Sequence, residues 1–172
     1  MHNMETTESK IQFKPETLAE AQRIISQFPE GKHKSALLRI LHLAQHEFGN
    51  WLSVEVMDYV AGLLKIKSIE VYEVASFYSM YNLKPVGKVV LEVCRTGPCC
   101  LVGVEKLLKH IENTLNIKPG ETSADGMFTL KTVECLGACG YGPMMQIGET
   151  YHEKLTEEKL DNLLSVLKSK NS

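Results

Sequence analysis

The chain has 172 residues, of which 44% are hydrophobic and 23% charged, and its formal net charge is −2 at pH 7. This length allows one domain or two small ones with a buried core. The near-neutral charge argues against a nucleic-acid-binding protein, which would present a basic face. No apolar run approaches the roughly 20 residues of a membrane span, so no direct membrane insertion is expected.

The N-terminus and the cysteine content bear on the cellular compartment. The first ten residues, "MHNMETTESK", have neither the basic start nor the apolar core of a signal peptide, and their acidic residues disfavour a mitochondrial transit peptide. We therefore expect a cytoplasmic protein in a reducing compartment, where structural disulfides are rare. The five cysteines are then expected to be free thiols or metal ligands.

The first half of the chain has helical periodicity. Residues 1–14 are polar and are predicted to be a disordered tail, whereas residues 15–80 are predicted to form a helical bundle. Pro15 suits the start of the first helix, and Ser53 and Ser68 suit the N-caps of the third and fourth. The four apolar stripes are Leu18, Ala21, Ile25 and Phe28; Leu37, Leu38, Leu41, Ala44 and Phe48; Met57, Val60, Ala61 and Leu64; and Val71, Val74, Ala75 and Tyr78.

The second half, residues 85–172, follows a linker at 81–88 and has a different pattern. "KVVLEV" and "MFTLKTVE" are typical of strands, and they run directly into Cys94 and Cys135. The other expected elements are a helix at 101–115, short strands at 144–148 and around Tyr151-His152, and a last helix capped by Thr156. This order predicts a two-layer, thioredoxin-like α/β domain. The expected fold class is therefore α+β in two parts, a helical bundle followed by that domain.

Four of the cysteines occur as two pairs at strand ends. "VCRTGPCC" separates Cys94 from Cys99 by four residues, and "ECLGACG" separates Cys135 from Cys139 by three. If the two strands are neighbours, both loops meet at one end of the sheet and four thiols converge. Glycines in these loops would let backbone N–H groups approach the sulfur atoms of an anionic group.

Spacing alone leaves several kinds of site open. A structural zinc site accepts pairs with two to four intervening residues, and a zinc-stabilised interaction module is the alternative from another class of protein. A 2Fe–2S cluster also takes four thiolates, and the C-x4-C pair matches half of the plant-type spacing. Plain buried thiols are the third possibility. A redox dithiol would need C-x-x-C, which does not occur, and a Rieske centre would need histidines in the loops.

Longer stretches of the chain resemble a known family. The C-x4-C pair followed by "ECLGACGYGP" is similar to the 24 kDa subunit of NADH:quinone oxidoreductase, respiratory complex I, and to related subunits of NAD-linked formate dehydrogenases and hydrogenases. "VYEVASFYSMYNLKPVGK" at 71–88 and "GETSADGMFTL" at 120–130 also resemble that family. The resemblance covers about residues 15–168.

This resemblance implies an electron-transfer subunit with one 2Fe–2S cluster, whose ligands would be Cys94, Cys99, Cys135 and Cys139. It places FMN and NADH on a partner, the NADH/FMN-binding subunit, with other peripheral-arm subunits as further partners. The complex would hold the chain on the cytoplasmic side of the inner membrane. The chain would be part of an oxidoreductase, but no catalytic activity is expected from it alone, because it has no G-x-G-x-x-G or phosphate loop.

A few other residues invite a functional interpretation. Cys100 adjoins Cys99 but is predicted to be a small core residue and not a fifth ligand. Arg95 is expected either to offset the charge of the cluster or to lie on the surface. His42 and His46 have helical spacing, but no third metal ligand is visible. The isomer of the peptide bond before Pro143 is left open.

Overall fold

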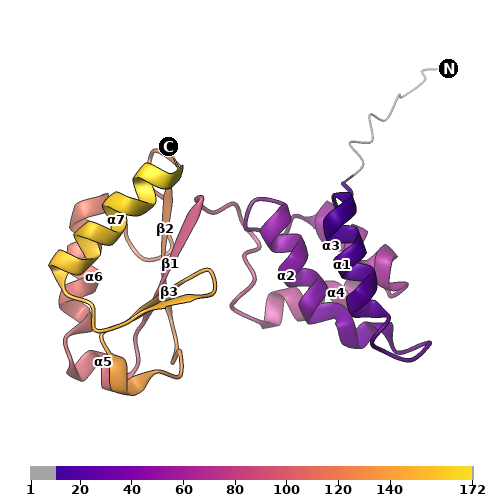
Figure 1. The fold of residues 1–172 in the computed structure, drawn as a ribbon, viewed down its shortest axis with the longest axis horizontal. Coiled ribbons are helices and arrows are strands. Elements are labelled where there is room, and N and C mark those ends of the chain that lie inside the picture. The colour runs from indigo at the N-terminus through magenta and orange to yellow at the C-terminus, as the bar shows by residue number, and fades with distance from the viewer. Residues whose placement is uncertain (1–10, 172) are drawn as a thin grey trace. The chain divides into compact units, whose positions relative to one another are not determined.

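The structure, a computed structural model, describes residues 11–171. The chain divides after Pro85 into two compact units, which are described separately below (Figure 1). Among the described residues, no helix combines the length and apolar character needed to cross a membrane.

The first unit is made of helices joined by short connections. Its elements are α1 (Pro15–Ile25), the 3-10 helix η1 (His33–Ala36), α2 (Leu37–Glu47), α3 (Val54–Leu64) and α4 (Ser68–Phe77). Most of the apolar stripe of each helix faces one common core, in which Ile24, Ile40, Leu41, Leu52 and Leu64 are fully buried. The prediction is wrong for Leu38 and Tyr78, which are 37% and 40% exposed. The four α-helices lie where the periodicity predicts them, because each stripe can be buried only against the others.

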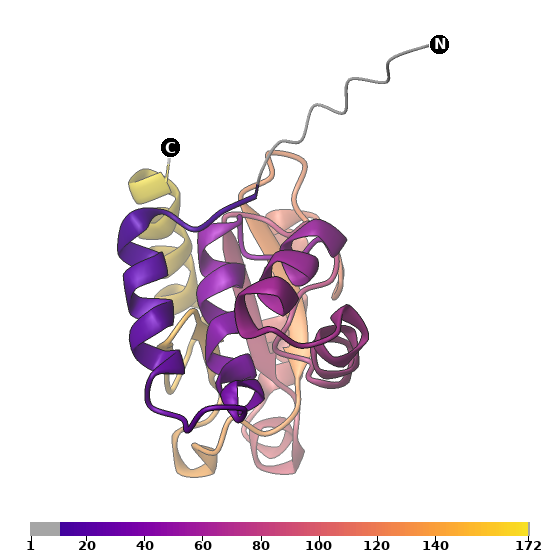
Figure 2. The same ribbon diagram turned by 90° about the vertical axis from the view of Figure 1, so that its right-hand side faces the viewer.

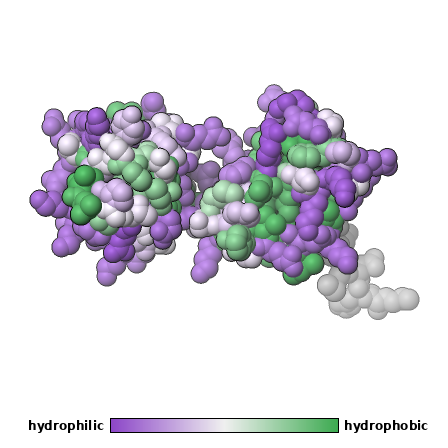
Figure 3. All heavy atoms as spheres, turned by 90° about the horizontal axis from the view of Figure 1, so that it is seen from below, coloured by the Kyte–Doolittle hydropathy of each residue, from purple (hydrophilic) through white to green (hydrophobic). Residues whose placement is uncertain are grey.

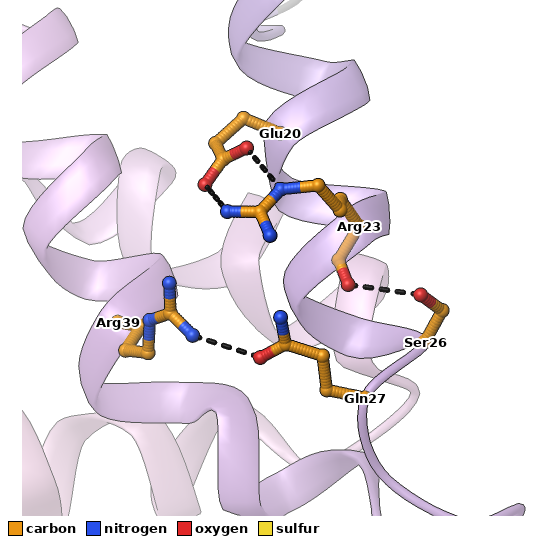
Figure 4. A network of polar contacts seen from close by, with 5 residues as sticks. All are labelled: Glu20, Arg23, Ser26, Gln27 and Arg39. Carbon is orange, nitrogen blue, oxygen red and sulfur yellow. Dashed lines mark hydrogen bonds and ion pairs between the residues drawn. The ribbon is translucent and has the colours of Figure 1, made fainter.

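Helices α1 and α2 run side by side, as Figure 2 shows. Figure 4 shows polar contacts at the surface of these helices. Glu20 and Arg23 form an ion pair of 2.6 Å within α1, and Arg39 of α2 donates a 2.9 Å hydrogen bond to Gln27, which follows α1. Exposed contacts of this kind add little to stability. The apolar core therefore holds these helices together.

Two of the predicted helix starts have different outcomes. Ser53 caps α3, since its hydroxyl accepts the N–H of Val56 at 3.3 Å. The prediction that Ser68 caps α4 is wrong, because the cap position is Lys67. The side chain of Glu70 accepts the Lys67 N–H at 3.0 Å, so a carboxylate within the first turn satisfies this donor.

A disordered tail is predicted for residues 1–14, of which residues 1–10 lie outside the described part of the chain. Its last part is corrected by the structure, because Phe13 is buried against the helical core. The Phe13 ring stacks on Phe48 with a centroid distance of 5.7 Å, and the Lys14 N–H donates to Glu47 at 2.6 Å. One large aromatic side chain thus anchors a segment that is otherwise polar.

The second unit has one four-stranded sheet. Its strands are β1 (Val89–Cys94), β2 (Phe128–Val133), β3 (Met145–Ile147) and β4 (Thr150–His152), in the order β2-β1-β3-β4. Strand β1 is parallel to β2 and antiparallel to β3, and β3 is antiparallel to β4. A parallel pair needs a crossover, which the chain segment between β1 and β2 supplies.

Helices α6 (Val104–Leu115) and α7 (Glu157–Asn171) lie on the same side of this sheet in Figure 1. Their apolar residues, including Leu107, Ile111 and Leu160, share one buried core with Leu91 and Leu130 of the strands. The predicted two-layer arrangement of strand, helix, strand, hairpin and helix is therefore confirmed. The Thr156 cap is also confirmed, because its hydroxyl accepts the N–H of Lys159 at 3.2 Å.

The helix predicted at 101–115 differs from the structure at its start. It is divided into a short helix α5 (Gly97–Leu101) and the longer α6, with Gly103 in the left-handed region at φ 96° between them. A glycine accepts this conformation without steric cost, so it allows the chain to change direction here. The segment between Cys94 and Cys99 is consequently part helix, not a simple loop.

Candidate metal centre

The register of β1 and β2 determines where the two cysteine loops start. Cys94 is the last residue of β1 and lies opposite Val133, the last residue of β2. Because the strands are parallel, the loop after Cys94 and the loop after Val133 leave the sheet at the same edge. The prediction that the thiols converge required β1 and β2 to be neighbouring strands, and the structure confirms that they are.

The four cysteines form one buried pair and one exposed pair. Cys94 and Cys99 are 2% and 1% exposed, and each thiol shifts the pKa of the other. Cys135 and Cys139 are exposed, with their Sγ atoms 3.5 Å apart. Within residues 11–171, no group of three or more His, Cys, Asp or Glu side chains has the arrangement needed to hold a metal ion.

The acidities of the thiols differ within each pair. Burial acts to raise the pKa of Cys94, but hydrogen bonds led by those from the Thr96 hydroxyl and the Leu136 N–H lower it overall. Burial and the adjacent Cys94 raise the pKa of Cys99 to about 11. The two thiols of this pair therefore differ in acidity, and Cys94 is the more acidic of the two.

The exposed pair behaves in the same way. The N–H of Gly137 and then the thiol of Cys139 lower the pKa of Cys135, whereas hydrogen bonding to Cys135 and the charge of Cys135 raise the pKa of Cys139. Because metal ligation needs deprotonated thiols, binding a metal here would release protons.

Glycines in the second loop serve two different purposes. Gly137 has φ 80°, and its N–H lies 3.3 Å from Cys135 Sγ, so it provides the close amide donor that the sequence predicts. Gly142 instead makes room: a Cβ atom there would lie 2.9 Å from Val102 Cγ2 and 3.2 Å from Cys99 Sγ. The peptide between Gly142 and Pro143 is cis.

A tyrosine that the sequence analysis did not single out for function holds the same loop. The hydroxyl of Tyr151, on β4, donates a 2.6 Å hydrogen bond to the carbonyl of Leu136. The N–H of Leu136 faces Cys94, so the backbone of one residue connects the hairpin to a thiol of the other loop. No local sequence pattern points to this contact, because the partners are in different elements.

The neighbouring candidates are not part of the cysteine cluster. Cys100 is exposed, so the prediction that it is a core residue is wrong. Arg95 is on the surface, where its Nε lies 3.2 Å from the carboxylate of Glu105. His42 belongs to the helical unit and packs on Tyr81 with a centroid distance of 5.2 Å.

Several large apolar side chains in or next to the cysteine loops are exposed. Leu101 is 90% exposed and Val102 and Tyr141 are each about half exposed. An open groove of about 870 Å³ runs beside them, with Pro143 and Leu155 in its lining. Large exposed hydrophobic side chains of this kind are typical of a protein interface.

The chemistry of these donors fits a 2Fe–2S cluster. Such a cluster takes two thiolates on each of its two irons, and the four sulfurs here are already paired. The backbone N–H of Gly137 and the Thr96 hydroxyl lie beside the sulfurs, where they can offset negative charge. When bound, a 2Fe–2S cluster accepts and releases single electrons.

Comparison with known proteins assigns the family. A family model described as thioredoxin-like [2Fe-2S] ferredoxin matches residues 21–168. The chain therefore belongs to the thioredoxin-like [2Fe-2S] ferredoxin family.

Similar proteins extend the match over nearly the whole chain. The E subunit of NADH-quinone oxidoreductase from Rickettsia typhi is 43% identical over 162 residues, which cover 94% of this chain and 95% of that protein. Its counterpart from Rickettsia felis is 46% identical over 152 residues, 88% of this chain and 91% of that protein. A mitochondrial NADH dehydrogenase [ubiquinone] flavoprotein 2 of Dictyostelium discoideum is 41% identical, and the match covers 91% of this chain and 64% of that protein.

The fold also occurs in a solved structure. An NAD+-reducing [NiFe]-hydrogenase in the air-oxidized state superposes with a TM-score of 0.66 at 20% identity. The match covers 77% of this chain and 23% of that chain. At this identity the likeness shows a shared fold only.

The close packing at Gly142 gives a first prediction. Gly142→Ala should push the side chains of Cys99 and Val102 away from residue 142, because both lie closer to the new Cβ atom than a normal contact distance. We expect a loss of about 1–3 kcal/mol in the free energy of unfolding and a lower iron content. Gly140→Ala is the matched control, since no heavy atom lies within 4 Å of its added Cβ. Equal behaviour of the two variants in chemical unfolding and iron analysis would contradict this interpretation.

The thiol acidities give a second prediction. In metal-free Cys100→Ala protein at neutral pH, iodoacetamide should alkylate Cys135 first, because Cys135 is exposed and its pKa is lowered. Cys99 should react last, because it is buried and protonated. Peptide mass spectrometry over time measures the order, and the same protein in denaturant, where the differences should vanish, is the control. Faster reaction of Cys139 than of Cys135 in the folded protein would refute it.

Proposed function

We propose that this chain is an electron-transfer subunit of NADH:quinone oxidoreductase that carries one 2Fe–2S cluster on Cys94, Cys99, Cys135 and Cys139. The observation that supports it most is that both cysteine loops begin at one edge of a sheet, in a chain related over 94% of its length to the E subunit of such an enzyme. Each pair would serve one iron. The domain at 85–172 would contain the whole site.

The residues around the site would bind and orient the cluster and would make no covalent bonds to a substrate. Cys94 and Cys99 would hold the buried side, while Cys135 and Cys139 would hold the side toward the surface. The exposed pair and the apolar side chains of Leu101 and Tyr141 would then face the partner that exchanges electrons with the chain. That partner would be the NADH/FMN-binding subunit, in the peripheral arm on the cytoplasmic side of the membrane.

The helical unit, residues 15–80, would be a small bundle that docks to partner subunits. Large hydrophobic side chains are exposed on this unit as well, and Figure 3 shows apolar groups on the surface of both units. Phe77 is 79% exposed and is followed by the half-exposed Tyr78 and Met80. Burial of such side chains is a common source of binding energy at subunit interfaces.

The equivalent subunit of an NAD-linked formate dehydrogenase or hydrogenase is the second candidate. The shared fold with an NAD+-reducing hydrogenase is compatible with it, but the relatives of high identity are quinone oxidoreductase subunits, and they favour the first. A zinc-stabilised interaction module remains the alternative from another class of protein. The metal content of the purified chain, iron or zinc, distinguishes this alternative from the two 2Fe–2S subunits.

A ligand experiment tests the site. Chain purified without oxygen should contain about two irons and two sulfides, and Cys→Ser at 94, 99, 135 or 139 should remove the cluster or strongly alter its electron paramagnetic resonance signal. Cys100→Ser is the matched control and should leave the signal unchanged, because Cys100 is not one of the four proposed ligands. Stoichiometric zinc in protein from its native source would overturn the proposal.

A second experiment tests the direction of electron flow. The isolated chain should not oxidise NADH, because NADH gives up two electrons as a hydride and a 2Fe–2S cluster accepts single electrons. When the chain is combined with its flavin-bearing partner subunit, NADH should reduce the cluster. The reduced 2Fe–2S centre should then give a low-temperature electron paramagnetic resonance signal. Dithionite is the positive control, since a low potential could limit reduction by NADH. NADH oxidation by the lone chain at the rate of the pair would exclude a pure carrier.

A further inference from the structure

Thr96 lies in the first cysteine loop, between Cys94 and Cys99 in the sequence. Its Oγ1 is 3.4 Å from Cys94 Sγ, within the distance of a hydrogen bond to sulfur. The residue is half-buried and sits where β1 ends and α5 begins, with an extended backbone at φ −108° and ψ 167°. Its carbonyl accepts the N–H of Cys100 at 3.0 Å. The strand before Thr96 and the helix after it therefore fix the position of its Cα atom.

The direction of this hydrogen bond follows from the chemistry of ligation. In the metal-free chain either the thiol or the hydroxyl can donate. A sulfur that ligates iron is a thiolate and has no hydrogen, so only the hydroxyl can donate to it. Ligation by Cys94 would therefore convert Thr96 into a charge-assisted donor, which is stronger than a neutral one.

We propose that the Thr96 hydroxyl is a hydrogen-bond donor to Cys94 Sγ, a ligand of the 2Fe–2S cluster, and raises the reduction potential of the cluster. This inference rests on the proposed function. Reduction adds one negative charge to a centre that is already anionic, so a donor at its sulfurs stabilises the reduced state more than the oxidised state. Arg95, the cation in the first loop, forms an ion pair with Glu105 at the surface. The Thr96 hydroxyl therefore contributes a larger share of the stabilisation of the reduced cluster.

The test compares Thr96→Val, which replaces the hydroxyl with a methyl group of similar size, with Thr96→Ser, which keeps the hydroxyl. The isolated chains are titrated potentiometrically, and the reduced cluster is followed by electron paramagnetic resonance. For Thr96→Val we expect the ratio of reduced to oxidised cluster at a fixed potential to fall about three- to tenfold, where tenfold corresponds to 59 mV for one electron. Thr96→Ser should restore the wild-type ratio.

A structural control separates tuning from simple destabilisation. Thr129 is buried toward the other end of β2, where its hydroxyl accepts the Gly87 N–H at 2.6 Å and lies 2.7 Å from Thr122 Oγ1. Thr129→Val should lower the stability of the domain without moving the potential. If Thr96→Val does not retain its cluster, Thr96→Ala and Thr96→Ser form the comparison at smaller side-chain volume.

A second readout does not depend on the potential. In D2O, pulsed electron paramagnetic resonance of the reduced wild-type cluster should detect a coupled exchangeable deuteron that is lost in Thr96→Val and retained in Thr96→Ser. An unchanged potential and an unchanged deuteron coupling in Thr96→Val, with normal iron content, would overturn the role of Thr96 while leaving the proposed function intact. A wild-type chain that holds no cluster at all would overturn both.

Discussion

The parallel pairing of β1 with β2 is the constraint on which the candidate site depends. Cys94 lies opposite Val133 in that ladder, so two loops that are far apart in sequence begin side by side. A shift of this register by one residue would turn the apolar residues of one strand away from the core. Leu91 and Leu130, which are paired and fully buried, therefore fix the positions of the cysteine loops as well as the core.

The division of the four thiols into a buried and an exposed pair follows from how each loop continues. After Cys94 the chain enters the short helix α5. Consecutive residues of a helix point about 100° apart, so Cys99 is buried in the core while its neighbour Cys100 is exposed to solvent. The second loop runs outward from β2 and returns through the cis peptide before Pro143. Gly142 lets this return pass directly against Cys99. The loop that carries the exposed pair thus covers the buried pair.

Much of this could be predicted from the sequence, and the exceptions have physical causes. The strands, the long helices and the meeting of the loops follow from periodicity and from the position of each cysteine pair after a strand. Helix α5 has only five residues, too few to show a period, so its effect on Cys100 could not be anticipated. Phe13 is a single aromatic residue in a polar stretch, and only the structure shows the ring of Phe48 on which it stacks. The Tyr151–Leu136 hydrogen bond joins a strand to a loop, and no spacing rule predicts it.

The groups that face the cysteine sulfurs are mainly neutral dipoles. Gly137 and Leu136 provide backbone N–H groups and Thr96 provides a hydroxyl, whereas Lys154 lies over the ring of Tyr141, 5.6 Å from its centroid. Neutral donors offset the charge of an anionic centre only in part, and they act at short range. A centre held this way would keep a low reduction potential, and its value would respond to the loss of any single donor. The exact placement of the second loop, through Gly137, Tyr151 and Gly142, would then be a means of setting the potential as well as a requirement for binding.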